Sequence, residues 1–128
     1  MPSDPPRPTG AELEILTVLW SRGPSTVRDV HEVVSERKAA QYTTVLKQLQ
    51  VMAEKGIVRR DETQRSHVYA PAKPKEWTRK QLAGDLLQRA FDGSPGGMVL
   101  GALSAKKASK RDLAEMRRMI DEYEKGMR

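Results

Sequence analysis

The chain has 128 residues, no cysteine, two histidines and a formal net charge of +6. The lack of cysteine excludes disulfides and thiolate metal sites, and the two histidines lie too far apart for metal-ligand spacing. No stretch approaches the roughly 18 to 20 apolar residues of a membrane span, and residues 1–10 show no apolar signal core. We therefore expect a cytoplasmic protein without metal, cofactor or membrane anchor.

The charge is distributed unevenly along the chain. Residues 1–36 hold three basic and six acidic side chains, whereas residues 37–73, the basic block, hold eight basic and three acidic ones. Such a block attracts a polyanion, although Lys and Arg often only solvate a surface. No nucleophile, base and orienting group occur together, and no glycine-rich phosphate loop is present. The sequence thus predicts a binding protein and not an enzyme.

Local signals predict a first helix over residues 11–21. Thr9 is a good N-cap residue, and Glu12 three positions later completes a capping box. Gly23 and Pro24 then end the helix, because both residues disfavour its continuation.

Two more helices are predicted before residue 56. Four valines recur at helical spacing after Ser25 or Thr26, either of which can cap the second helix. Because β-branched residues are mediocre helix formers, residues 25–27 can instead begin as a short strand, and both options stay open. The third helix is predicted over residues 41–55 and ends at Gly56, which suits the left-handed position after a helix.

A hairpin follows the three helices. Residues 57–60 and 67–70 have the composition of two strands, and the polar connection 61–66 lacks a glycine turn, so its tip should be long and exposed. Three helices followed by a hairpin is the order of a winged helix-turn-helix. We predict such a DNA-binding domain for residues 9–71, within a fold that is mostly α with a small β-hairpin wing.

Beyond a linker framed by Pro71 and Pro74, residues 75–128 are predicted to form a helical dimerisation domain. Apolar positions between residues 77 and 91 mark one helix, and a short apolar turn is expected at residues 98–103. That turn should begin with the Ser-Pro pair just before it, since both residues favour a helix start.

The last predicted helix opens with Ser109 and Asp112 and carries a heptad seam. Its apolar residues, at spacings of 3, 4, 3 and 4, are Leu113, Met116, Ile120, Tyr123 and Met127. About two heptads are too few for a stable coiled coil alone, so we expect a dimer, with packing inside one subunit as the alternative. The expected dimer interface consists of Leu86, Leu113, Met116, Ile120 and Tyr123.

The third helix carries the candidate DNA-reading residues, because the second helix of a helix-turn-helix enters the major groove with its N-terminal side chains. Gln pairs with adenine, Lys with guanine, and Thr with phosphate or the thymine methyl group. Arg65 at the hairpin tip should lie near the adjacent DNA backbone or minor groove, where it supplies affinity more than sequence readout. The expected DNA-binding residues are Gln41, Tyr42, Thr43, Thr44, Lys47 and Gln48 in the helix, and Arg65, Ser66 and His67 near the tip. A solvated polar face is the alternative, and His31 is interpreted as a surface or partly buried helix residue.

Several short motifs are also similar to those of a known family. They are Tyr42-Thr43-Thr44-Val45, Leu49, Lys55-Gly56, Val58, Arg60 and His67-Val68-Tyr69, with Glu12-Leu13-Glu14-Ile15-Leu16, Leu19-Trp20 and Gly23-Pro24 before them. With these motifs the chain resembles the penicillinase-repressor family of BlaI, MecI and CopY regulators, well over residues 9–71 and loosely in the tail. The resemblance implies a homodimer that represses transcription by binding a palindromic operator, with C-terminal helices that make the dimer.

Two modes of derepression in that family find no matching residues in this sequence. Copper-responsive members carry C-terminal cysteines, which this chain lacks. Resistance repressors are cleaved at an Asn-Phe bond in a short C-terminal helical turn, where this chain has Leu100-Gly101-Ala102-Leu103. The inducing signal, and an upstream sensor or protease as a partner, therefore stay open. A transcriptional activator and a protein-interaction module are alternative functions of the same fold.

Overall fold

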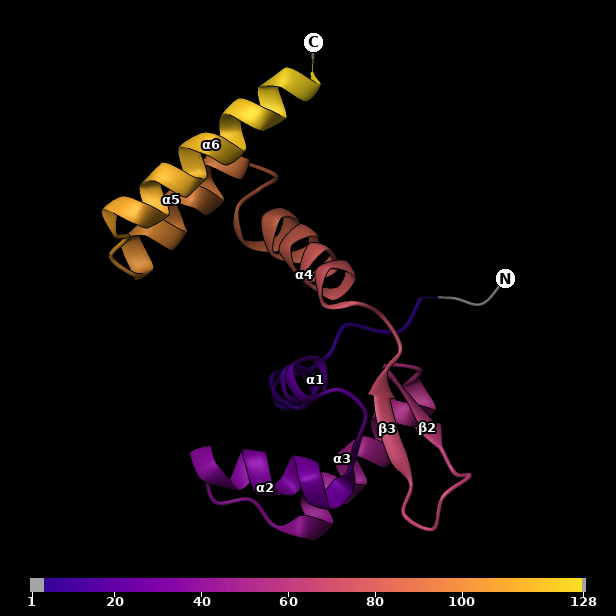
Figure 1. Ribbon diagram of the computed structural model, residues 1–128. Helices are drawn as coiled ribbons and strands as arrows, with labels where there is room; N and C mark the ends of the chain where they lie inside the picture. Colours follow the sequence, from indigo (N-terminus) through magenta and orange to yellow (C-terminus); the bar gives the residue numbers. More distant parts are fainter. Residues whose placement is uncertain (1–3, 128) are drawn as a thin grey trace. The chain divides into compact units, whose positions relative to one another are not determined.

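The computed structural model of the chain describes residues 4–127 (Figure 1). Along the chain the elements are α1 (Gly10–Arg22), β1 (Ser25–Thr26), α2 (Val27–Arg37), α3 (Tyr42–Lys55), β2 (Val58–Asp61), β3 (Val68–Pro71), α4 (Lys75–Ala90), α5 (Pro95–Ala105) and α6 (Lys110–Gly126). None of the helices in this range is both long and apolar enough to cross a membrane. The described chain forms two compact units that divide within α4, between Ala83 and Gly84. The functional boundary expected at residues 71–75 stays a prediction.

Capping boxes begin the first two helices of the N-terminal unit. At α1 the Glu12 amide donates to Thr9 Oγ1 over 3.2 Å, and the Thr9 amide donates to Glu12 Oε1 over 2.9 Å, which confirms the predicted box. Thr26 and Asp29 form the same arrangement at α2. Residues Ser25–Thr26 form the short strand β1, as one of the two predicted options has it. Thr26 also caps α2, which begins directly afterwards at Val27, as the other option has it.

A three-stranded antiparallel sheet with the order β1-β3-β2 completes this unit. Tyr69 in the central strand pairs with Ser25 on one side and Arg60 on the other. Each hairpin strand begins one residue later than predicted. The reason at β2 is that the Ile57 amide still closes α3, since it donates to the Met52 carbonyl over 2.9 Å.

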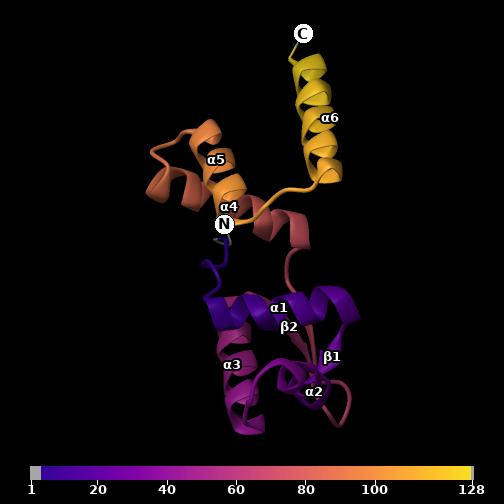
Figure 2. The same cartoon turned by 90° about the vertical axis from the view of Figure 1, so that its left-hand side faces the viewer.

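The hydrophobic core of the unit draws on all three helices and on the sheet. Its buried side chains are Ile15, Leu16, Val18, Leu19, Val27, Val30, Val34, Val45, Leu49, Met52, Ile57, Val58 and Tyr69. Both ribbon views show α1, α2 and α3 gathered around one another with the sheet beside them (Figures 1 and 2). The helix α3, which holds most of the candidate DNA-reading residues, is therefore fixed from beneath by core packing.

The C-terminal unit contains a longer α5 than the sequence predicted. Instead of a short turn at residues 98–103, the structure has an 11-residue helix. Ser94 caps it by accepting from the Gly97 amide over 3.0 Å, as expected. The glycines of the helix allow Phe91 to approach closely, because a Cβ atom at Gly101 would lie 3.0 Å from the Phe91 ring. The helix is longer than expected because it begins directly after the Ser94 cap, at Pro95, three residues before the predicted turn.

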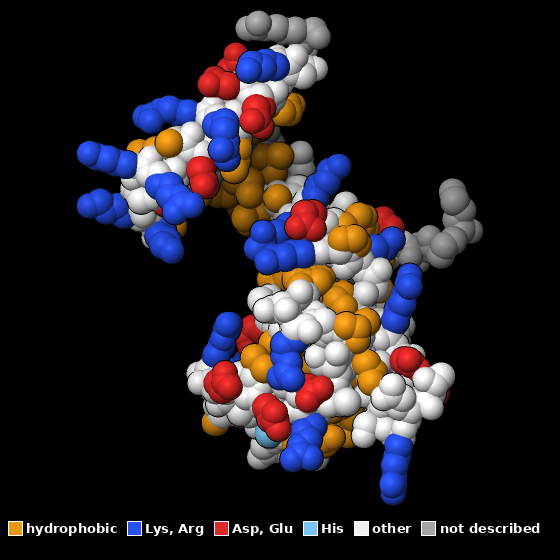
Figure 3. Space-filling model, viewed as in Figure 1, with side chains coloured by type: hydrophobic (Ala, Val, Ile, Leu, Met, Phe, Trp, Pro, Cys, Tyr) orange, Lys and Arg blue, Asp and Glu red, His pale blue; other side chains and the backbone are white. Residues whose placement is uncertain are grey.

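The last helix begins as predicted, with a reciprocal capping box between Ser109 and Asp112. Neither α5 nor α6 holds a buried residue in the described chain. Figure 3 shows hydrophobic side chains, in orange, gathered on the surface of this unit beside α6. Within its described residues, the unit thus lacks the enclosed core that the N-terminal unit has.

Candidate nucleic-acid interface

The predicted contact residues at the start of α3 lie on its surface, and we call them together the α3 strip. Its members are the exposed Gln41, Tyr42, Thr43, Thr44 and Lys47 and the half-buried Gln48. On the opposite side of the helix Val45 and Leu49 are 1% and 0% exposed. The amphipathic pattern of α3 therefore points the polar side chains outward while the apolar ones hold the helix to the core.

An open groove of about 420 Å³ brings four members of the strip together. It lies between α1 and α3 and is lined by Thr9, Glu12, Thr43, Thr44, Lys47, Gln48 and Val51. Among residues 4–127 no ion pair engages Lys47. The strip thus presents a free cation beside hydroxyl and amide groups, a set that suits contacts with phosphates and base edges.

The start of α3 differs from the starts of α1, α2 and α6. Those three helices have an acidic residue and a side-chain cap in their first turn, whereas Gln41 occupies the α3 N-cap without a side-chain capping bond. The first turn of α3 also has no acidic side chain. The positive end of the helix dipole is therefore not neutralised by a carboxylate, which favours the approach of an anion.

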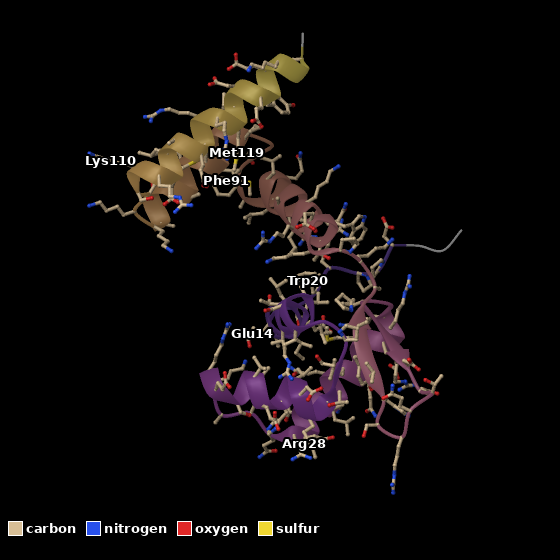
Figure 4. All side chains as sticks on the ribbon, in the orientation of Figure 1. Glu14, Trp20, Arg28, Phe91, Lys110 and Met119 are labelled. Carbon is tan, nitrogen blue, oxygen red and sulfur yellow. The ribbon has the colours of Figure 1, made fainter. Side chains whose placement is uncertain are left out.

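Two ion pairs with α1 hold α3 and the turn before it. Lys55 Nζ lies 2.9 Å from the Oε2 atom of the buried Glu12, and Lys38 Nζ lies 3.0 Å from Glu14 Oε2. Glu14 is labelled on α1 in Figure 4. Burial raises the pKa of Glu12, but hydrogen bonds from Thr9 and Lys55 outweigh burial and bring the pKa below its ordinary value. Glu12 is therefore a charged group that positions α3, a role that the sequence analysis missed.

The wing tip is shaped by its own polar residues. Asp61 Oδ1 accepts from the Thr63 amide over 2.9 Å and from the Thr63 hydroxyl over 2.7 Å, which folds the connection back. These two bonds also lower the pKa of Asp61. The predicted contact residues Arg65, Ser66 and His67 are all exposed there. The predicted DNA-binding residues therefore form two groups, the α3 strip and the wing tip.

The cations of the basic block fall into two groups, those that pair with carboxylates and those that do not. Lys38, Lys55 and Arg60 pair with carboxylates, Arg60 with Glu62 over 2.6 Å. A hydrogen bond to Tyr69 and then the charge of Glu62 raise the pKa of Arg60. Within the described residues, no ion pair engages the other five, which are Arg37, Lys47, Arg59, Arg65 and Lys73. On the face seen in Figure 3, basic and acidic side chains of this unit are interspersed.

The five residues expected at a dimer interface lie on the surface of the chain to different degrees. Leu86, Ile120 and Tyr123 are 49%, 57% and 73% exposed, whereas Leu113 and Met116 are half-buried. Met116 lines a groove of about 490 Å³ between α5 and α6. The sequence analysis missed four further apolar residues that the structure leaves exposed in this unit, which are Val99, Leu100, Leu103 and Met119.

Comparisons with known proteins agree with this architecture. The sequence profile of the family described as penicillinase repressor matches residues 8–122. The transcriptional regulator BlaI of Mycobacterium tuberculosis is 36% identical over 117 residues, which cover 90% of this chain and 83% of that protein. The penicillinase repressor of Bacillus licheniformis is 23% identical over 118 residues, which cover 92% of each chain.

Two solved structures share the fold over more than half of this chain. The DNA-binding domain of the repressor BlaI matches with a TM-score of 0.51 and 23% identity, over 58% of this chain and 90% of that one. Bacillus licheniformis BlaI, solved as a monomeric form in complex with the blaP half-operator, matches with a TM-score of 0.50 and 23% identity, over 57% and 89%. Together with the profile match, these similarities confirm the winged-helix prediction and the predicted resemblance. The chain therefore belongs to the penicillinase repressor family.

Proposed function

We propose that this protein is a transcriptional repressor that binds a palindromic DNA operator as a homodimer through its winged helix-turn-helix. The observation that carries the proposal is the α3 strip, where Thr43, Thr44 and Lys47 lie exposed on a helix whose other face is locked into the core. An exposed polar helix of this kind fits the major groove. Related BlaI proteins are transcriptional regulators, and one has been solved with a half-operator.

The homodimer rests on the surface of the C-terminal unit. Ile120 and Tyr123 in α6 are more than half exposed, and α5 and α6 have no buried residue in the described range. Helices of this length are marginal in water unless an apolar face is covered, so a second copy of the unit is the fitting cover. A two-fold dimer presents two copies of α3, and two-fold symmetry in the protein favours a palindromic site.

Selection of DNA from a random pool, followed by titration of the selected duplex, tests this function. Lys47→Ala should weaken binding to the selected duplex by about tenfold, the cost of one specific base or charged phosphate contact. Lys80→Ala is a matched control, because Lys80 is an exposed helical lysine outside the α3 strip and the wing tip. Selection that yields no preferred duplex would contradict the repressor function, and equal affinities for both variants would remove Lys47 from the interface.

Salt dependence adds a second readout to the same titration. If Lys47 contacts a phosphate, its loss should reduce the slope of log affinity against log salt by about 0.9, because one fewer counterion is released. A base contact leaves that slope unchanged but removes preference at one position of the site. A protein-interaction module would show neither effect, since its affinity for duplex DNA would not depend on the α3 strip.

A further inference from the structure

The turn between α2 and α3 is held by the side chain of His31, which has no part in the function proposed above. His31 Nε2 lies 2.8 Å from the carbonyl oxygen of Ala40, two residues before α3 begins. Because a carbonyl can only accept, Nε2 carries the proton and donates it. His31 is half-buried at the edge of the α2 face that holds the buried Val30 and Val34. The histidine thus connects the core side of α2 with the backbone at the entrance to α3.

The same imidazole ring also contacts the first residue of α3. The ring centroids of His31 and Tyr42 lie 5.7 Å apart with a 74° angle between the planes, an edge-to-face arrangement. Tyr42 is itself 47% exposed and belongs to the α3 strip. His31 on α2 therefore contacts both the Ala40 carbonyl, before the N-cap of α3, and the exposed ring of Tyr42 in the candidate interface.

The hydrogen bond from His31 to Ala40 holds the start of α3, which has no side-chain cap. Gln41 forms no side-chain capping bond, so its own side chain does not fix where α3 begins. The amides of Thr44 and Val45 both donate to the Gln41 carbonyl, over 3.1 and 3.2 Å, which ties the first turn to this residue. The peptide that joins Gln41 to Ala40 is held by His31 on one side, and the Ala40 side chain packs against the core.

We propose that His31 is a positioning residue for DNA recognition, which sets the start of α3 through its bond to the Ala40 carbonyl. The proposal rests on the proposed repressor function, because it concerns the same α3 strip. Contacts to base edges depend on side-chain geometry within a fraction of an ångström, whereas nonspecific binding depends mainly on charge. Loss of the His31 bond should therefore reduce specific binding and leave nonspecific binding unchanged.

Two substitutions in the full chain separate the hydrogen bond from the ring contact. His31→Gln keeps a donor at the position of Nε2 but removes the ring, and His31→Phe keeps a ring but removes the donor. Affinity is measured for the duplex that the wild-type protein selects from a random pool and for a random duplex of equal length. We expect His31→Phe to bind the selected duplex about fivefold more weakly, the scale of one hydrogen bond, and His31→Gln to stay within about twofold of wild type. Neither variant should change affinity for the random duplex.

The proposal is overturned if His31→Phe binds the selected duplex like the wild type, if it weakens both duplexes equally, or if His31→Gln is as weak as His31→Phe. Should His31→Phe fail to fold, His31→Leu, which also lacks a donor, takes its place: a fivefold loss for the selected duplex supports the donor role, and wild-type affinity overturns it. Hydrogen exchange of the Thr44 and Val45 amides, which donate to the Gln41 carbonyl, should be faster in His31→Phe than in the wild type and unchanged in His31→Gln. These rates test the positioning of the turn even if the wild-type protein prefers no duplex, a result that would refute the proposed function separately.

Discussion

The buried carboxylate of Glu12 should stabilise the N-terminal unit in a manner that depends on pH. The side chain is 6% exposed, its Oε1 atom accepts from the Thr9 amide, and its Oε2 atom lies 2.9 Å from Lys55 Nζ. Glu12→Gln keeps an acceptor for the Thr9 amide but removes the charge that faces Lys55. We expect this substitution to lower the free energy of unfolding by about 1.5 to 3 kcal/mol at neutral pH, the scale of one hydrogen bond to a charged group.

The sign of the pH dependence follows from the lowered pKa of Glu12. A carboxyl group whose pKa is lower in the folded chain than the ordinary 4.5 stabilises the fold fully above that value, and this stabilisation is lost as the pH falls through the folded pKa. The difference between wild type and Glu12→Gln should therefore be full at pH 7 and shrink near pH 3. Asp29 and Asp112 also have lowered pKa values, but they titrate in both proteins and cancel in the difference.

Urea unfolding followed by circular dichroism at both pH values measures this difference. Glu14→Gln is the matched control, because Glu14 lies on the same helix and pairs with Lys38, but its side chain is 52% exposed. An exposed pair contributes about 0 to 1 kcal/mol, so the control should lose less stability than Glu12→Gln at neutral pH. A loss for Glu12→Gln that is the same at both pH values would refute the reasoning, since the charge of Glu12 would then not be the source of the stability.

Three further outcomes are expected. Arg65→Ala should weaken selected and random duplexes alike and reduce the salt slope by about 0.9, as measured in the same titrations, and a loss confined to the selected duplex would show that the wing reads bases. Ile120→Asp should give a monomer in sedimentation, because an unpaired carboxylate in an apolar interface costs several kcal/mol, and a stable dimer would place the seam elsewhere. Gly56→Ala should lower the free energy of unfolding by about 1 kcal/mol in urea, since Gly56 has a φ of 82°, and an unchanged value would contradict a left-handed requirement there.

Local sequence signals predicted most of the helices of this fold because their causes lie within a few residues. The pairs Thr9 and Glu12, and Ser109 and Asp112, cap helices from three positions away, and both were correctly predicted. The role of β1 as a third strand was not predictable in this way. A two-residue strand has no pattern of its own, and Ser25 becomes a strand residue only because it pairs with Tyr69, 44 positions later in the chain.

The candidate site shows the same division between local and distant causes. The outward face of α3 follows from its helical period, so the exposed Thr43, Thr44 and Lys47 agree with the sequence pattern. The sequence did not reveal which cations of the basic block are already neutralised. For Lys38 and Lys55 that depends on acids from α1, and the Glu12 to Lys55 pair spans 43 residues. Charge counts along the chain therefore overestimated the number of cations that are free to meet a polyanion.

The N-terminal unit has a hydrophobic core of its own, whereas the C-terminal unit depends on the proposed dimer to cover its apolar residues. This difference affects how operator binding responds to protein concentration. The N-terminal unit encloses a core from three helices and a sheet, whereas α5 and α6 bury no residue within the described chain. If the homodimer forms as proposed, folding of the C-terminal unit is linked by mass action to protein concentration, while the DNA-reading unit stays folded. Dilution would then dissociate the dimer before α3 loses its position. Because tethering raises the effective concentration of the second α3 at its half-site, a modest fall in dimer concentration would reduce operator occupancy without any change in the contacts that each α3 makes.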